Sequence, residues 1–256
     1  MTVALPLPTR MERIGQLRKR IKELVPSSSK RAVPTGADEI DALLPAGGLK
    51  QGALHEVAAA DHRAQPAAFG LLLALVRTIL AAHGGPLLWP FAKQAVYAFG
   101  TPYGPGLRFF GIDPEALILV RCASPREALW SMAEGLRLGG LGAVAGMRVP
   151  RMNLAASRRL QLAAESSATP VFLLRPHDDA EPSAAVTRWR VAPAACARDR
   201  FGFFRTARWH VSLERARGAG RLGEWMVEWD HDAFRLRLSS VLAGRALPQD
   251  AERRCA

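Results

Sequence analysis

Continuous apolar runs alternate with helical patterns between residues 54 and 174. Five short apolar runs predict buried strands, at residues 54–57, 87–89, 117–120, 143–147 and 171–174. Apolar residues at helical spacing predict three helices, over residues 64–83, 125–138 and 153–168. Apolar runs without alternation are typical of strands that are covered on both faces. This region therefore predicts an α/β fold, with a mostly parallel sheet, flanking helices and right-handed crossovers.

The pattern changes after residue 186, where apolar and polar positions alternate. Trp189 alternates with Arg188 and Arg190, and the same period recurs at residues 209–214, 225–230 and 234–238. A period of two is typical of strands with one solvated face. We expect these segments to extend the sheet with antiparallel strands. The stretch ARGAGRLG, residues 216–223, suits one of the turns.

The two ends of the chain have patterns of their own. Residues 11–25, MERIGQLRKRIKELV, place an apolar stripe on one side of a helix and basic residues on the other. A stretch with prolines and serines follows and predicts a linker. We therefore expect an amphipathic helical arm and linker at residues 1–32, one domain at 33–240, and a flexible tail at 241–256.

Composition narrows the class of protein. The chain has 256 residues, of which 49% are hydrophobic, enough for a sizeable core. No run reaches the roughly 18 consecutive apolar residues of a membrane span, and the first residues lack the regions of a signal peptide. Cys122, Cys196 and Cys255 are too scattered for a disulfide framework or a metal site. These features predict a cytoplasmic protein with no membrane partner.

The net charge of +12 has two explanations. Lysine and arginine neutralise phosphates, so a strongly basic chain favours a nucleic-acid partner. However, only five of the 35 basic residues are lysine, and alanine is abundant. A GC-rich genome produces the same bias without any functional pressure. Charge alone leaves both explanations open.

A glycine-rich turn, PAGGLKQG, precedes a strand, a loop and a helix, which is where a phosphate-binding loop usually lies. Such a loop needs glycines, a lysine for the terminal phosphate, and Ser or Thr for magnesium. Here the loop is AAADHRAQP, residues 58–66, which includes Ala59 and has Gln65 at the lysine position and Pro66 at the hydroxyl position. Arg63 could contact phosphate, but Asp61 opposes an anion. We expect a degenerate loop and no nucleotide cofactor.

Other catalytic chemistry has little support in the sequence. The strand at residues 143–147 ends in GAVAGMRV without a carboxylate for magnesium, and WPFAK offers no glutamate after the second strand. HDDAE, residues 177–181, is a single acidic cluster that we interpret as a solvated turn rather than a metal site. No serine or cysteine lies in a nucleophile elbow. The sequence therefore predicts no catalytic residue, no metal and no enzyme activity.

The order of elements resembles the RecA-type core, and PTGADEIDALLPAGGLKQGALHEV is similar to the segment that leads RecA-like proteins into their phosphate loop. Five further segments resemble ImuA, the RecA-like accessory protein of the bacterial mutasome. They are GIDPEALILVR (111–121), EALWSMAEGLR (127–137), SRRLQLAAESSATPVFLLR (157–175), AAVTRWRV (184–191) and GEWMVEWDHD (223–232).

This resemblance implies a function. ImuA-like proteins are non-catalytic adaptors that bind ImuB, an inactive Y-family polymerase homologue. Through ImuB they reach an error-prone replicative-type polymerase during translesion synthesis in the DNA damage (SOS) response. RecA is a further partner to expect. Two alternatives stay open: a RecA-like ATPase or recombination mediator with an atypical nucleotide site, and a SulA-like cell-division inhibitor.

Two groups of residues are candidates for contact with these partners. The first is a basic patch for single-stranded DNA, at and after the fourth strand: Arg148, Arg151, Arg158 and Arg159. The second group would bind a protein and lies around the turn at residues 216–223: Arg215, Arg217, Arg221, Trp225 and Trp229. The alternative for these arginines is a solvated turn, and for the two tryptophans a place in the core beneath a helix.

Overall fold

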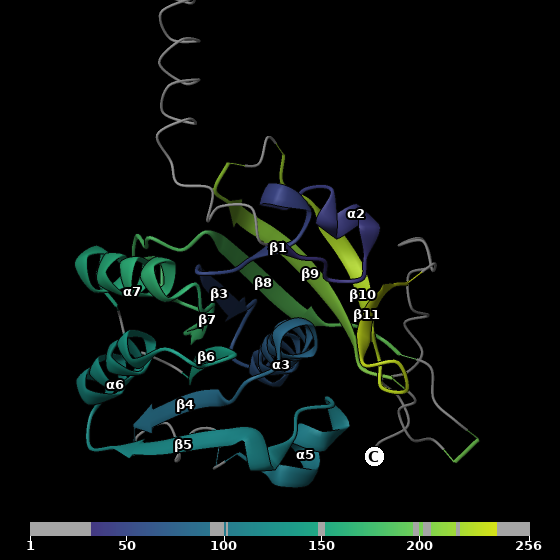
Figure 1. Ribbon diagram of the computed structural model, residues 1–256. Helices are drawn as coiled ribbons and strands as arrows, with labels where there is room; N and C mark the ends of the chain where they lie inside the picture. The colour runs from purple at the N-terminus through teal and green to yellow at the C-terminus, as the bar shows by residue number, and fades with distance from the viewer. Residues whose placement is uncertain are drawn as a thin grey trace, which may run out of the picture.

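A nine-stranded mixed sheet organises the chain (Figure 1). The computed structural model describes residues 32–92, 100, 102–147, 152–196, 200–201, 206–218 and 221–239. The arm expected at residues 11–25 and the tail expected at 241–256 lie outside these ranges. The α/β class predicted from the apolar pattern is confirmed.

The parallel part of the sheet contains the five strands predicted from apolar runs. They are β3 (Leu54–Ala59), β4 (Leu87–Ala92), β5 (Leu117–Cys122), β6 (Ala143–Met147) and β7 (Val171–Arg175). The order in this part is β3-β7-β6-β4-β5, and each neighbouring pair is parallel. The first strand of the set therefore lies beside the last, and β5 forms one edge of the sheet.

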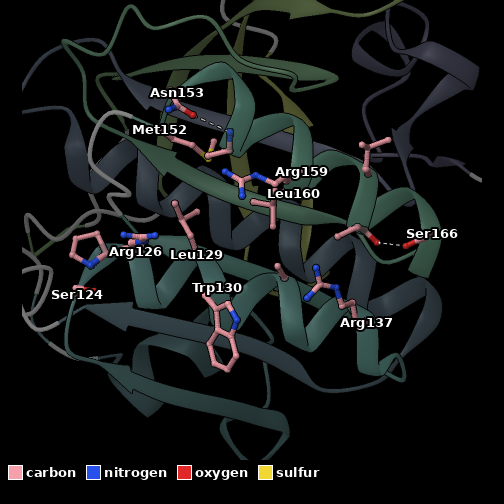
Figure 2. Close-up of a pocket in the computed structure, with 15 residues that line it drawn as sticks. Ser124, Arg126, Leu129, Trp130, Arg137, Met152, Asn153, Arg159, Leu160 and Ser166 are labelled. Atoms are coloured by element: carbon pink, nitrogen blue, oxygen red, sulfur yellow. Dashed lines mark hydrogen bonds between the residues drawn. The ribbon is translucent and has the colours of Figure 1, made fainter.

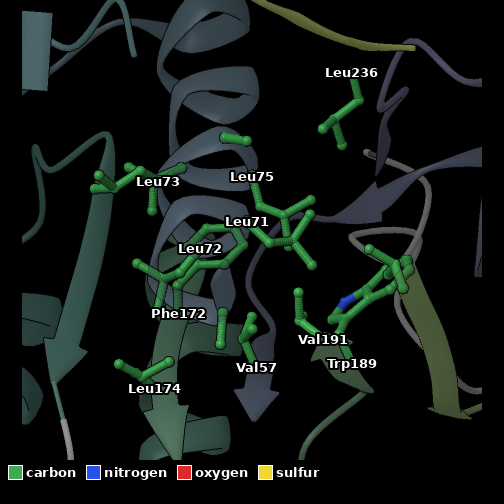
Figure 3. Packing of buried hydrophobic residues seen from close by; sticks show 14 of the residues in the cluster. Val57, Leu71, Leu72, Leu73, Leu75, Phe172, Leu174, Trp189, Val191 and Leu236 are labelled. Atoms are coloured by element: carbon green, nitrogen blue, oxygen red, sulfur yellow. The ribbon is translucent and has the colours of Figure 1, made fainter. Parts of the chain in front are cut away.

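Helices cover both faces of the parallel strands. Helix α3 (Gln65–His83) packs on one face, and α6 (Pro125–Leu138) and α7 (Leu154–Ser167) pack on the other. Successive strand side chains point to opposite faces, so Phe172 and Leu174 of β7 contact the α3 side while Leu173 packs under α6 and α7. Figure 3 shows Phe172 and Leu174 beside the leucines of α3. All three helices begin and end within one residue of their predicted bounds.

Helix α3 is apolar around most of its circumference because it lies in the middle of the larger core. Ten of its residues are buried. By length and composition alone α3 is apolar enough to cross a membrane, but 56% of that stretch is buried inside the protein. The core position explains the composition.

The alternating segments form the antiparallel extension that was predicted. Strands β8 (Thr187–Pro193), β9 (Arg208–Ala216), β10 (Glu224–Asp230) and β11 (Arg235–Leu238) follow one another in space. Strand β8 joins the two parts, because it is parallel to β3 and antiparallel to β9. The turn was expected at residues 216–223, the stretch between β9 and β10, of which residues 219 and 220 lie outside the described ranges.

Several short elements have no signal in the hydrophobic pattern. They are β1 (Ala32–Val33), β2 (Leu49–Lys50), α2 (Asp38–Asp41), α5 (Gly104–Phe109) and two 3-10 turns at Pro45–Gly47 and Pro114–Ala116. Strands β1 and β2 pair as a small separate sheet. A Cβ atom on Gly48 would lie 2.4 Å from the carbonyl oxygen of Val33. Part of the glycine-rich turn is therefore needed for this tight pairing.

Candidate functional site

The connection between β3 and α3 is the segment in which the sequence predicts a degenerate phosphate-binding loop. The Oδ1 atom of Asp61 accepts hydrogen bonds from the backbone N–H groups of Arg63 and Ala64, each at 2.8 Å. The N–H of Ala64 is the main reason that the pKa of Asp61 lies below its usual value. In a phosphate loop such N–H groups face the bound anion. Here a carboxylate of the protein itself accepts from them.

The rest of the connection is also held by internal bonds. The N–H of Ala60 donates to the carbonyl of Val191 at 2.8 Å, and the carbonyl of Ala59 accepts from the Arg190 side chain at 3.1 Å. Gln65 begins α3 and Pro66 follows it in the first turn. Proline has no N–H to offer an anion. Only Arg63 among the five residues singled out in this loop carries a cation, and it is exposed.

A cavity of about 880 Å³ lies at the carboxyl edge of the sheet, beside the first turns of α3. Open α/β sheets bind their ligands at this edge. The aromatic side chains of Phe69, Phe110 and Trp209 contribute to its walls. In the described lining one residue is permanently charged, Arg208, and it is already bonded to Glu228. The cavity suits apolar groups and offers no unpaired guanidinium or ammonium for a triphosphate.

A buried ionic network that was not predicted from the sequence joins three neighbouring strands. Glu56, in the middle of β3, has a fully buried side chain. Its carboxylate accepts from Arg175 of β7 at 2.7 Å and from Arg188 of β8 at 2.9 Å. The hydroxyl of Ser183 also donates to it, at 2.9 Å. Because β7 and β8 flank β3 on its two sides, both arginines reach the same carboxylate.

The acidic segment HDDAE, residues 177–181, belongs partly to this network. Asp179 is bonded to Arg175 at 2.6 Å, and both side chains are almost completely buried. Burial alone would lower the pKa of Arg175, but the carboxylates of Glu56 and Asp179 raise it above its usual value. The interpretation of this segment as a solvated turn was therefore wrong for Asp179. Arg175 is the last residue of β7, and Asp179 lies four residues further along the chain. The side chain of Asp179 pairs with that of Arg175 and neutralises its charge.

The network is suited to structure rather than chemistry. The Glu56 carboxylate is held by guanidinium groups from two sides and by the Ser183 hydroxyl, so its oxygens are already engaged within the protein. Within the part of the chain that the structure describes, no three His, Cys, Asp or Glu side chains could hold a metal ion together. A sequence signal for the network did exist. It was the charged glutamate inside the short strand LHEVAA, in which His55 is the other polar residue.

The predicted basic patch is divided by the structure. Arg148 and Arg151 lie outside the described residues. Arg158 and Arg159 are both exposed on α7. Arg159 faces a groove between α6 and α7, whereas Arg158 is not part of the lining of that groove. The two neighbouring arginines therefore lie on different surfaces.

The candidate protein-binding residues around the β9–β10 turn also separate into different environments. The Arg215 side chain donates to the carbonyl of Ser183 at 2.6 Å, so it secures the loop before β8. Arg217 and Arg221 are exposed and Trp225 is half-buried. Trp229 is completely buried. Trp229 therefore lies in the core, which was the alternative stated for the tryptophans. A partner would not reach its side chain in this fold.

Comparison with known proteins adds no relative. No protein-family model matches the chain, and no curated protein is similar to it at a significant level. The fold and the site define an α/β protein with a large, mostly parallel sheet and C-terminal antiparallel strands. In the connection between β3 and α3, the backbone N–H groups of Arg63 and Ala64 are bonded by the carboxylate of Asp61.

Proposed function

We propose that this chain is a non-catalytic adaptor with a RecA-like fold, which binds an ImuB-type polymerase homologue and supports error-prone translesion synthesis. The observation that carries the proposal is the hydrogen bonding of Asp61. Its carboxylate accepts from the two loop N–H groups that a phosphate would need. The function of the chain then depends on its surface and not on a nucleotide.

Electrostatics and shape support the absence of a nucleotide site. A phosphate at this loop would have to displace the Asp61 carboxylate or lie beside it, and like charges at short distance repel. The neighbouring cavity is walled by aromatic side chains, and its arginine, Arg208, is paired with Glu228. Neither place offers a set of N–H donors together with an unpaired cation.

The resemblance to ImuA supports the choice of partner. The similar segments fall on β5, on α6, on α7 with β7, and on β8 and β10, in the same order along the chain. The order of elements, with a parallel core followed by antiparallel strands, is the one expected of a RecA-like protein. In ImuA-like proteins the C-terminal part is implicated in binding ImuB, and here that part is the antiparallel extension of the sheet.

Two measurements on the full chain test this function. The first is a pull-down of a purified ImuB-type homologue by the tagged chain, without nucleotide. The second is a titration of the chain with ATP and magnesium, followed by calorimetry. We expect capture of the homologue and no saturable heat from ATP.

Each alternative gives a different result. Saturable ATP binding that is lost in Arg63→Ala would support the ATPase or recombination mediator. Failure to capture the polymerase homologue, together with capture of the division protein FtsZ and filamentation on overexpression, would support a SulA-like inhibitor. Either result would overturn the adaptor proposal.

A further inference from the structure

An open groove of about 1000 Å³ lies between α6 and α7, on the face of the sheet opposite α3. Both helices contribute aliphatic side chains to it. Leu129 and Ala133 come from α6, and Ala156, Leu160 and Ala163 come from α7. Figure 2 shows Leu129 and Leu160 in the space between the two helices. The groove has an apolar floor that reaches the protein surface.

The spacing of these residues gives the groove the shape of a helix-binding site. Ala133 follows Leu129 by four residues, and Ala156, Leu160 and Ala163 follow one another at intervals of four and three. Rows at this spacing run along a helix and receive the ridge of a neighbouring helix. The alanine side chains are short, so a bound helix can approach α6 and α7 closely in the middle of the groove. Since α6 has 14 residues, the groove is about 20 Å long, enough for roughly three to four turns of helix.

Large apolar side chains continue the floor onto the surface. Trp130 of α6 is 62% exposed and Leu162 of α7 is 50% exposed, and both belong to the groove lining. Contiguous exposed apolar side chains next to a concave surface mark interaction sites. Tryptophan is also one of the residue types that are enriched among binding hot spots.

The rim of the groove is positively charged. Arg126, Arg137 and Arg159 line it, and no Asp or Glu is found among its described lining residues. Arg137 is paired with Glu134 on the same helix. Arg126 and Arg159 make no ion pair within the described parts of the chain. Two guanidinium groups are therefore available to carboxylates of a bound molecule.

We propose that this groove binds an acidic amphipathic helix of a partner protein. The apolar side of that helix packs on the alanine and leucine floor, and its carboxylates pair with Arg126 and Arg159. Helices that lie in apolar grooves are a recurrent mode of recognition. The inference stands whether or not the partner is the ImuB-type homologue proposed above.

Charge and chemistry argue against other occupants. The chain's own first 31 residues contain eight Lys or Arg and two Glu, so their charge has the same sign as the rim. A single strand of nucleic acid needs aromatic platforms on which bases stack. Trp130 is the one aromatic side chain in the described lining, and the floor beside it is aliphatic.

A displayed peptide library tests the proposal on the full chain. Peptides of about 15 residues carry fixed leucines at helical spacing and either Glu or Lys at the remaining positions. Selection is carried out against the native chain and against Ala163→Trp, which fills the groove. We expect glutamate-rich peptides to be enriched on the native chain and lost on the filled variant. Ala133→Trp is a second filled variant, used if the first melts early.

Charge reversal at the rim provides the matched comparison. For a selected peptide, fluorescence anisotropy should show that Arg126→Glu with Arg159→Glu weakens binding by roughly tenfold or more. Arg158→Glu changes the neighbouring residue outside the lining and should leave the Kd within about twofold.

Four results would overturn the inference. One is the absence of enrichment over the filled variants, and another is enrichment of lysine-rich peptides. A third is equal loss of binding in Arg158→Glu. The fourth is a different occupant, shown by a single-stranded oligonucleotide that competes for the groove, or by a dimer of the chain that Ala163→Trp dissociates.

Discussion

Replacing Glu56 by glutamine isolates the contribution of the buried ionic network. The substitution keeps the shape of the side chain and removes its charge, which leaves Arg175 and Arg188 facing an amide. Removing one partner from a buried ion pair costs about 3–5 kcal/mol of folding free energy. Arg175 keeps Asp179, and the Arg188 side chain is 15% exposed, so both stranded cations retain some compensation. We therefore expect a loss of about 3 kcal/mol, the lower end of that range.

The measurement is urea unfolding at pH 7, with Glu214→Gln as the matched control. Glu214 is also a strand glutamate paired with an arginine, Arg190, but its side chain is 31% exposed. A pair of that kind contributes about 0–1 kcal/mol and weakens with salt. The Glu56 effect should persist at high salt, with unchanged m-values. A loss for Glu56→Gln no larger than for Glu214→Gln would refute the reasoning.

Three further predictions concern buried positions and use exposed or roomier positions as controls. Burial lowers the pKa of His55 to about 4, so the unfolded chain binds the proton more readily than the folded one. Stability should therefore fall by about 2–3 kcal/mol from pH 6.5 to 4.5, and urea unfolding of His55→Asn should show a smaller fall; equal slopes would contradict this. Gly70→Ala should lower the Tm, although alanine favours helices, because the added carbon would lie 2.7 Å from a tryptophan ring of β9. Gly106→Ala, with its nearest atom at 3.5 Å, should leave the Tm unchanged or raise it, and identical effects would count against the packing argument. In urea unfolding, Trp229→Ala should cost about 3–5 kcal/mol and Trp130→Ala less than about 0.5 kcal/mol, and similar losses would show that the assigned burial is wrong.

The regular part of the fold was predictable because its pattern is long and strongly periodic. The run in α3 and the apolar strands each fix their own secondary structure, so their bounds came within a few residues. The short elements α2 and α5, and the β1–β2 pair, have no such pattern. They are too short for a period to show, and they are held by contacts with residues far along the chain.

The candidate site was predictable only where its interactions are local. Asp61 lies two and three residues before the N–H groups that it accepts from, so the composition of the loop already indicated that an anion is disfavoured. Glu56 and Arg175 are 119 residues apart, and no local pattern brings them together. Alternation in β8 predicted a solvated face for Arg188. The loop at residues 176–186 covers that face instead, and a burial of this kind depends on tertiary structure.

Ion pairs and hydrogen bonds within the protein hold two segments beside β3, the β3–α3 connection and the loop that follows β7. This affects whether the affinity for a partner depends on nucleotide. On one side, Asp61 bonds the N–H groups at the start of α3, where the helix dipole would otherwise favour an external anion. On the other, Glu56 and Asp179 hold the loop that follows β7 through Arg175. A change of shape on nucleotide binding would need charges at this edge that a ligand can engage. Here those charges are already paired. For the adaptor proposed above, we therefore expect the affinity for a partner to be the same with and without ATP and magnesium.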